Sequence, residues 1–204
     1  NVEIGNHSHS HEYLVDENSE IIRNDILKSI EIFEKELGEN SEFFSYPFGE
    51  YSLEFKKIIK DLGFKYAFGQ HSGVVDYTKN FFEMPRFPIN EKYGEIERFK
   101  TILKTLPFPF KSILPENRYI SDKNNPPNVN IKFYENIKNL KNINCFSNEE
   151  DKWRNSNINF IDKYNLKINL DGKFVTERGR INCSLRETNG FYRWLGVQFV
   201  VKEK

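Results

Sequence analysis

Three of the chain's four histidines, His7, His9 and His11, lie close together near its start. On a helical turn, the spacing of His7 and His11 puts both imidazoles on one side, where they could grip one metal ion. On an extended strand, by contrast, all three rings would share a face. The sequence favours a turn, because Gly5 and Asn6 end the preceding apolar run.

A catalytic metal usually has three protein ligands and an open position for water, and two histidines supply only two of these ligands. Glu12 and Asp16 are candidates for the third position by proximity alone. The alternative interpretation of the cluster is a polar loop that binds no metal. Judged on spacing, metal binding is the better hypothesis.

The elements that must position these histidines alternate between strands and helices. Residues 18–38 carry apolar side chains three and four residues apart, which predicts a helix capped by Asn18 or Ser19 and ended by Gly38. Two further helices are predicted over 53–63 and 93–106, and short strands over 2–5, 42–46, 64–69 and 81–85. This order predicts parallel βα units and an α/β fold class.

Chemistry in such folds gathers on the loops that follow the strands. The loops after the expected strands contain the histidine cluster, the turn PFGEYS, the loop GQHSG and the segment PRFPINEKYG. All unusual residues of this half of the chain fall in these loops. Their coincidence predicts a functional site at one end of the sheet.

Two motifs resemble those of a known family. Residues 2–11, VEIGNHSHSH, resemble the metal-binding signature of the polysaccharide deacetylases, the NodB-homology domains of carbohydrate esterase family 4. Residues 45–49, SYPFG, resemble the family's next motif, and the gap of one helix between the two also fits. The resemblance covers residues 1–110. It implies a distorted (β/α) barrel, present here in part, and hydrolysis of N-acetyl groups on an amino-sugar polysaccharide.

The resemblance also implies roles for individual residues. His7 and His11 would bind a divalent metal, usually zinc, and the backbone N–H of Phe48 would help to hold the oxyanion of the tetrahedral intermediate. The metal would polarise the acetyl carbonyl and lower the pKa of its bound water.

Three residues beside Phe48 could contact the sugar. Tyr46 could line the substrate site or belong to the core. Pro47 and Gly49 could also lie at the substrate, but a purely conformational role is the better interpretation, because proline fixes φ and glycine permits a tight turn.

The chain departs from the family pattern in three ways. The earlier Thr-Phe-Asp-Asp motif, which supplies the general base and the third metal ligand, is absent, so we expect a fragment that is inactive alone. Ser45 replaces a common arginine, and Arg86 could supply that charge and orient the base. The late motif with the general-acid histidine has no clear match. His71 is the spare histidine for that role, and an ordinary polar loop residue is the alternative.

The second half of the chain has a different character. Residues 111–128 are rich in proline and asparagine and are predicted to be a linker. Residues 129–204 are predicted to form a small antiparallel β-domain, with hairpin turns at Asp171-Gly172 and Asn189-Gly190.

Two further sets of residues in this half leave alternatives open. Cys145 and Cys183 could form a disulfide in an oxidising compartment or remain buried thiols. Trp153, Trp194 and Tyr192 could form a platform for sugars, but the domain core is the better interpretation.

Composition limits the partners. The 30 basic and 30 acidic residues balance, which gives no electrostatic reason to expect nucleic acid. No run approaches the length of a membrane span. The expected partner is an N-acetylated polysaccharide, and the resemblance implies an address in the cell envelope or outside the cell. The alternatives are a glycan-binding module without catalysis and a metal amidohydrolase for small N-acyl substrates.

Overall fold

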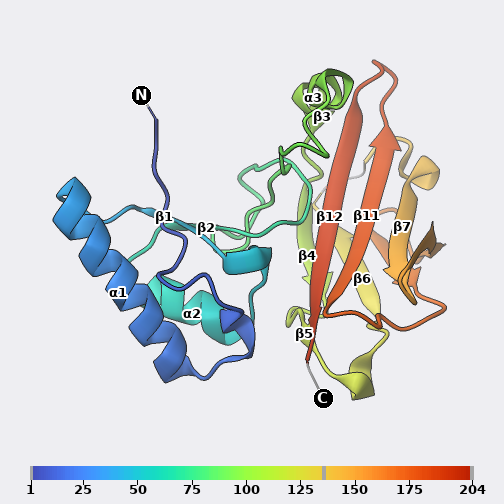
Figure 1. Cartoon of the computed structure of the whole chain (residues 1–204). Coiled ribbons are helices and arrows are strands. Elements are labelled where there is room, and N and C mark those ends of the chain that lie inside the picture. The colour runs from blue at the N-terminus through green and yellow to red at the C-terminus, as the bar shows by residue number, and fades with distance from the viewer. Residues whose placement is uncertain (1, 135–136, 203–204) are drawn as a thin grey trace. The chain divides into compact units, whose positions relative to one another are not determined.

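The computed structural model of the chain describes residues 2–134 and 137–202, which form two compact units (Figure 1). The first, here called the α/β unit, runs to Gln70 and includes Asn80–Met84. The second, the β-rich unit, comprises His71–Lys79 and the chain from Pro85 onward. No helix in residues 2–134 or 137–202 combines the length and apolar character needed to cross a bilayer.

The α/β unit contains two helices and a small parallel sheet. Its elements in chain order are η1 (Leu14–Asp16), α1 (Ser19–Leu37), β1 (Phe43–Ser45), η2 (Pro47–Gly49), α2 (Leu53–Asp61) and β2 (Tyr66–Phe68), where η marks a short 3₁₀ helix. Strands β1 and β2 pair in parallel, with Phe44 opposite Ala67. The α/β class predicted for this part of the chain is confirmed.

Helix α1 begins and ends where its local signals predict. The side chain of Asn18 accepts hydrogen bonds from the backbone N–H groups of Glu20 and Ile21, and Gly38 ends the helix with a φ of 87°. The expected apolar face is buried only in its first half, at Ile22 and Ile26. Leu37 at the far end of the face is 53% exposed.

Two expected strands are reduced to single bridges. In place of a strand over 2–5, Asn6 forms one parallel bridge to Phe44, and in place of a strand over 81–85, Met84 forms one to Phe68. The unit therefore holds four parallel segments side by side in chain order, with β1 and β2 in the middle. Phe44, Tyr46 and Phe55 pack edge to face in the core beneath them.

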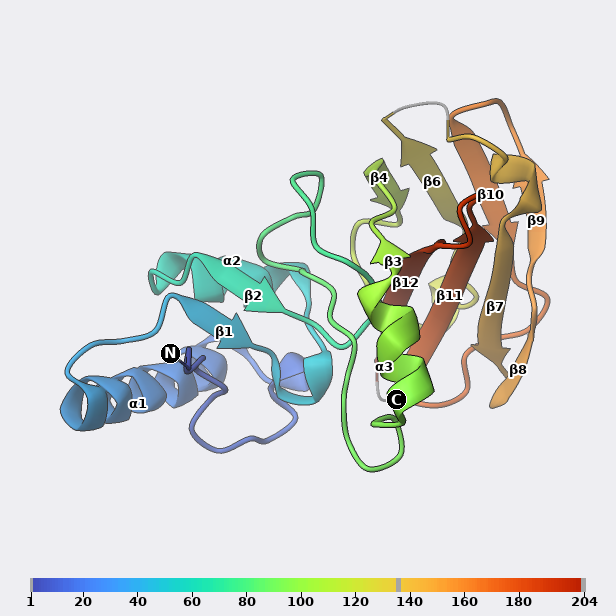
Figure 2. The ribbon, with the colours of Figure 1, turned by 90° about the horizontal axis from the view of Figure 1, so that it is seen from above.

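The β-rich unit is a sandwich of two sheets. Its elements are α3 (Ile96–Leu103), β3 (Thr105–Leu106), β4 (Phe110–Leu114), β5 (Tyr119–Ile120), η3 (Asp122–Asn124), β6 (Val129–Phe133), η4 (Leu140–Asn142), β7 (Asn144–Glu149), β8 (Lys152–Asn155), β9 (Asn157–Phe160), β10 (Asn165–Asn169), β11 (Arg178–Arg186) and β12 (Tyr192–Val201). One sheet has the order β3-β12-β11-β7-β8, with β5 also paired to β12, and the other has the order β4-β6-β10-β9. Figure 2 shows both layers from above.

The core of the sandwich comes from alternate residues of both sheets, as the period of two in a strand requires. Ile131 and Ile168 contribute from one sheet, and Ile181, Val197 and Phe199 contribute from the other. The predicted antiparallel β-domain is therefore present, and it includes more of the chain than the expected residues 129–204.

The expected linker over 111–128 and the expected first domain over 1–110 do not match the two units. The segment 111–128 contains most of β4 and all of β5, and Ile113 and Ile120 are buried in the sandwich core. Helix α3 and strand β3 belong to the β-rich unit, where Thr105 pairs with Tyr192. The proline and asparagine residues of this segment lie in turns between short strands. A linker can have the same composition, so composition alone did not distinguish the two.

Only one of the two predicted hairpins forms. Strands β11 and β12 pair along their length, and the Gly190 N–H donates to the Glu187 carbonyl oxygen at 3.0 Å in the turn between them. Strand β10 instead pairs with β6 and β9, so Asp171-Gly172 joins no hairpin. The N–H of Gly172 donates to the buried carboxylate of Glu149 at 2.5 Å. This side-chain contact, and not a hairpin partner, holds the turn.

The structure decides between disulfide and thiols for the cysteines, and it contradicts the core interpretation of Trp153. Cys145 on β7 and Cys183 on β11 lie opposite each other and form a disulfide. Trp153 is not part of the core, because 54% of it is exposed, and Trp194 and Tyr192 are partly exposed.

Candidate functional site

The histidine loop follows directly from the first parallel segment of the α/β unit. Asn6 carries the last ladder contacts: its N–H donates to the Phe43 carbonyl oxygen and its carbonyl oxygen accepts from the Ser45 N–H, both at 2.8 Å. Beyond it, Ser8 has a φ of 70° and His11 has a φ of 55°, both in the left-handed region. These two residues coil the loop tightly, so it is neither the strand nor the regular helical turn considered from spacing.

The buried side chain of Asn6 holds this coil from below. Its Oδ1 accepts from the Ser8 N–H at 3.1 Å and from the Ser29 hydroxyl of α1 at 2.7 Å. Asn6 is fully buried, and its Nδ2 has no hydrogen-bond partner among the described residues. Sequence analysis assigned Asn6 only to the end of a strand. The position of an Asn just before a polar cluster was the signal for a side chain that caps the following backbone.

Asp25 of helix α1 holds the loop from the side. Its two carboxylate oxygens accept from the backbone N–H groups of His9 and Ser10 at 2.9 and 3.0 Å. Hydrogen bonds to an ionised acceptor are stronger than neutral ones, so this pair fixes the middle of the loop against the helix. Sequence analysis missed this role, because an Asp inside an amphipathic helix carries no local sign of it.

The rings of His7 and His11 lie together, with their centroids 4.9 Å apart and their planes at 67°. The Nδ1 atom of His7 lies 2.6 Å from the carbonyl oxygen of Ser45 at the end of β1. A carbonyl oxygen only accepts, so Nδ1 carries the proton and the lone pair of Nε2 is available to a metal. Ser45, which stands where the family motif commonly has an arginine, thus orients His7 through its backbone carbonyl.

The Pro47–Gly49 turn closes over the second histidine. Phe48 has a φ of 56° and a ψ of −1°, and its ring centroid lies 4.8 Å from that of His11. Gly49 has a φ of 80°, and a Cβ there would lie 2.3 Å from the Cβ of Gln70. Both the backbone conformation and the close approach therefore require glycine.

Tyr46 is a core residue, which decides between the two alternatives considered for it. The side chain is fully buried and its hydroxyl donates to the Phe82 carbonyl oxygen at 2.9 Å. Burial raises the pKa of the phenol well above its usual value, and the neighbouring Tyr51 and Glu83 add to the effect. Pro47 and Gly49 are also buried, so their contribution to the site is the shape of the turn.

His71 and Arg86 belong to the β-rich unit, whereas the histidine pair and Phe48 belong to the α/β unit. Within the β-rich unit, the Arg86 N–H donates to the His71 carbonyl oxygen at 3.1 Å. Burial lowers the pKa of the Arg86 guanidinium from its usual value. Their roles as general acid and orienting charge stay predictions.

The paired histidines lack a third ligand within residues 2–134 and 137–202. Over these ranges, no group of three or more His, Cys, Asp or Glu side chains could hold a metal ion. Glu12 and Asp16, the neighbours considered for this position, therefore do not complete the set. The donor set is two imidazoles on one side of a fixed loop.

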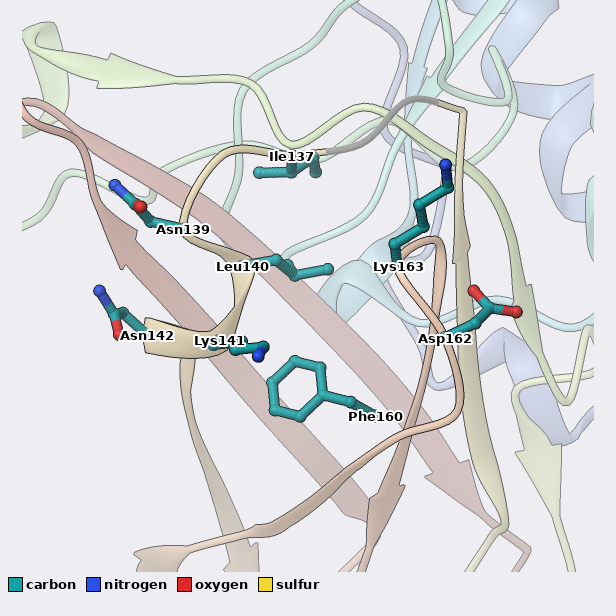
Figure 3. A pocket seen from close by; sticks show the side chains of 8 residues that line it. All are labelled: Ile137, Asn139, Leu140, Lys141, Asn142, Phe160, Asp162 and Lys163. Atoms are coloured by element: carbon teal, nitrogen blue, oxygen red, sulfur yellow. The ribbon is translucent and has the colours of Figure 1, made fainter.

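A cavity of about 720 Å³ opens in the β-rich unit (Figure 3). Its lining residues come from two segments, 137–142 with η4 and 160–163 at the end of β9: Ile137, Asn139, Leu140, Lys141, Asn142, Phe160, Asp162 and Lys163. The pKa of Asp162 is lowered by hydrogen bonds from the Tyr164 N–H and the Asn165 side chain, so its carboxylate is occupied by its own turn. The lining holds no histidine or cysteine, and none of the residues predicted for the site lies there.

Comparisons with known proteins bear on the histidine loop and its surroundings. Residues 1–67 match the family model for polysaccharide deacetylase. No curated protein is significantly similar to the chain.

Among solved structures, the Streptococcus pyogenes deacetylase PplD in complex with acetate is similar, with 19% sequence identity and a TM-score of 0.41. The similarity covers 44% of this chain and 39% of that one, so this chain spans well under half of that protein's length. The family match contains both His7 and His11 and the whole Pro47–Gly49 turn, and it supports the polysaccharide deacetylase assignment that these motifs predicted.

Proposed function

We propose that the chain is part of a metal-dependent enzyme that removes N-acetyl groups from an amino-sugar polysaccharide. The observation that carries the proposal is the pairing of His7 and His11, whose ring centroids lie 4.9 Å apart within the family match. The hydrogen bond from His7 Nδ1 to Ser45 at 2.6 Å supports it, because metal-binding histidines commonly donate their second ring N–H to a carbonyl.

The metal would be held by His7 Nε2 and by one ring nitrogen of His11. Zinc is the first candidate, because it readily accepts imidazole ligands. When bound, the metal would polarise the acetyl carbonyl and lower the pKa of a bound water, which would supply hydroxide near neutral pH. We propose that the third ligand and the general base come from an Asp-Asp pair that this sequence does not contain.

The chain's own residues would contribute the rest of the site. The backbone N–H of Phe48 would donate to the oxyanion, since the turn that carries it packs its ring against His11. Arg86 would orient the base and His71 would act as general acid. The hydrogen bond from the Arg86 N–H to the His71 carbonyl oxygen supports roles for both residues, because it holds their backbones next to each other within the β-rich unit.

We further propose that the α/β unit is part of a distorted (β/α) barrel. Four parallel segments in chain order, with α1 and α2 as the connections around β1, support this architecture. Val2 and Ile4 precede the first segment and are 90% and 54% exposed, which suits an edge where further strands would add.

An address in the cell envelope or outside the cell also belongs to the proposal. Such polymers lie outside the cytoplasm, and the disulfide between Cys145 and Cys183 supports an oxidising compartment.

Two measurements test the function. The first is zinc binding to the 204-residue chain by calorimetry, with His7→Ala and His11→Ala each expected to abolish it. The second is acetate release from an N-acetylglucosamine oligomer by a longer form of the protein that carries the Asp-Asp pair. There, each substitution is expected to reduce the rate by about a hundredfold or more, because the ion loses a direct ligand.

His9→Ala is the matched control, because its exposed ring lies outside the pair and only its backbone holds the loop. It is expected to leave zinc binding and acetate release close to wild type. Zinc binding that survives both His7→Ala and His11→Ala would rule out the proposed ligands. Acetate release by the 204-residue chain alone would contradict the need for the Asp-Asp pair.

A further inference from the structure

The outer face of the β-rich unit's larger sheet carries an unusual set of side chains on β7, β8 and β11. Along β7, Cys145 and Ser147 point into the sandwich and are fully buried, whereas Asn144 and Phe146 point outward and are exposed. Figure 1 shows β12, β11 and β7 side by side, with β4 and β6 behind them.

The strand register places the outward residues in one continuous surface. Phe146 lies opposite Asn155 of β8 on one side and opposite Asn182 of β11 on the other. Asn144 lies opposite Ser184, and Trp153 lies two residues before Asn155 on β8. We call this surface the amide–aromatic face, formed by Asn144, Phe146, Trp153, Asn155, Asn182 and Ser184.

The two aromatic rings of the face are open to solvent. Trp153 is 54% exposed and Phe146 is 38% exposed. Neither ring contacts another aromatic ring within residues 2–134 and 137–202. Their positions are diagonal across the β7–β8 pair, which places their Cβ atoms roughly 7–8 Å apart and lets both rings serve one ligand.

The polar side chains around these rings have hydrogen-bonding groups to spare. In the described part of the chain, no hydrogen bond engages the side chain of Asn144, Asn155 or Ser184. Asn182 Oδ1 has only a long contact of 3.5 Å with the Trp194 indole N–H. The neighbouring Asn148 is different, because its amide bonds the Arg178 carbonyl oxygen and the Arg180 N–H at the start of β11.

The face ends where the chain's own loop covers β12. The Gly196 N–H donates to the Ser72 carbonyl oxygen at 2.6 Å, and a Cβ at Gly196 would lie 2.6 Å from backbone atoms of Ser72. Phe87 packs edge to face on Trp194 beside this contact. Glycine at position 196 therefore lets the loop lie on the sheet, and β7 and β8 remain open.

We propose that the amide–aromatic face binds a neutral polysaccharide chain. Sugar rings stack their apolar faces on exposed Trp and Phe, and amides and hydroxyls exchange hydrogen bonds with sugar hydroxyl and N-acetyl groups. None of the six residues is charged, and Arg180, two residues before Asn182 on β11, is a cation beside them, whereas the phosphates of a nucleic acid require clustered Lys and Arg. That the polymer is N-acetylated rests on the proposed function. The stacking and amide contacts are argued from the face alone and do not depend on that function.

The test is binding of an N-acetylglucosamine hexamer to the 204-residue chain, measured by calorimetry. Trp153→Ala and Phe146→Ala are each expected to weaken binding by at least about tenfold, the loss typical of an aromatic anchor. Asn155→Ala is expected to weaken it by a smaller factor. Tyr77→Ala is the matched control, because Tyr77 is 91% exposed in the same unit and lies outside the strands β7, β8 and β11 that carry the six residues.

Two further arms separate this proposal from its rivals. Trp153→Ala and Phe146→Ala are expected to leave zinc binding by the 204-residue chain unchanged, so the outcome of the zinc experiment does not decide this proposal. The polyanion heparin is expected not to compete with the hexamer. The proposal is overturned if the wild-type chain does not bind the hexamer at millimolar concentration, if the Trp153 and Phe146 variants bind like Tyr77→Ala, or if heparin competes in a salt-dependent way.

Discussion

The Nδ1 atom of His7 lies 2.6 Å from the carbonyl oxygen of Ser45, the last residue of strand β1. This contact joins a loop that follows one parallel segment to the end of the next. It fixes the rotation of the imidazole, whose ring centroid lies 4.9 Å from that of His11. The first histidine of the pair is therefore oriented by the sheet itself.

The first prediction concerns the tautomer of His7. We expect the neutral ring to carry its proton on Nδ1, because the Ser45 carbonyl oxygen can only accept. Nitrogen-15 NMR of labelled histidine distinguishes the two tautomers directly. His9, whose backbone N–H donates to Asp25, serves as the internal comparison. A His7 ring protonated on Nε2 would contradict the arrangement described here.

The second prediction concerns Asp25, which holds the middle of the histidine loop. Asp25→Ala removes both acceptors of the His9 and Ser10 N–H groups. We expect zinc affinity to fall by about tenfold, because residues that orient metal ligands typically contribute that much. Glu31→Ala, at an exposed position on the same helix, is the control and should leave the affinity unchanged. Equal affinities of the two variants in calorimetry would argue against a positioning role.

The third prediction compares two glycines with positive φ in the α/β unit. Gly49→Ala places a Cβ 2.3 Å from the Cβ of Gln70, whereas Gly38→Ala meets no atom within 4 Å. We expect the free energy of unfolding to fall by about 3 kcal/mol or more for Gly49→Ala, from backbone strain and overpacking. Gly38→Ala should cost about 1 kcal/mol, from strain alone. Urea denaturation of both variants measures the difference, and similar losses would refute the close packing of the turn.

The fourth prediction concerns Tyr46 at alkaline pH. Burial holds its pKa well above the usual value of 10.0, so the native state keeps a proton that the unfolded state loses. The contribution to stability is complete below about pH 10 and is lost as the pH rises toward the native pKa. Tyr46→Phe should reduce this alkaline loss and cost about 1 kcal/mol at neutral pH, from the hydrogen bond to Phe82.

Denaturant unfolding at a series of pH values, with Tyr77→Phe as the exposed control, measures the effect of Tyr46→Phe. An alkaline loss of stability that is unchanged in Tyr46→Phe would show that other groups dominate.

The fifth prediction concerns the disulfide between β7 and β11. The bond closes a loop of 38 residues, and loss of this constraint on the unfolded chain is expected to lower the free energy of unfolding by about 4 kcal/mol. Cys145→Ala with Cys183→Ala, and reduction of the wild-type chain, are two independent ways to measure it. Both should destabilise the β-rich unit. If neither shifts the denaturation midpoint, the bond does not contribute to the stability of the fold.

The local sequence determined the features whose causes are local. The helix over 18–38 was predictable because its periodicity, its Asn18 cap and its Gly38 end all act within a few residues. The spacing of His7 and His11 indicated a paired site for the same reason. A hairpin also formed around Asn189-Gly190, since its flanking strands are neighbours in the chain, but Asn189 does not have the positive φ of the type I′ turn that this dipeptide predicts.

Only the tertiary structure decided the features that depend on distant partners. The segment 111–128 resembled a linker because neither of its strands pairs within the segment: β4 pairs with β6, which follows the segment, and β5 pairs with β12, far along the chain. The Asp171-Gly172 turn failed as a hairpin because β10 pairs with β6 and β9 instead. Strand pairing is a contact between distant residues, and short alternating segments do not encode which neighbour they will meet.

The same division holds for the candidate site. The sequence determined which residues could bind a metal, because imidazole chemistry and spacing are properties of the residues themselves. The Ser45 carbonyl that orients His7, the Asp25 carboxylate that holds the loop and the burial of Tyr46 come from other elements. These contacts exist only once α1 and β1 pack beside the loop, so only the tertiary structure could decide them.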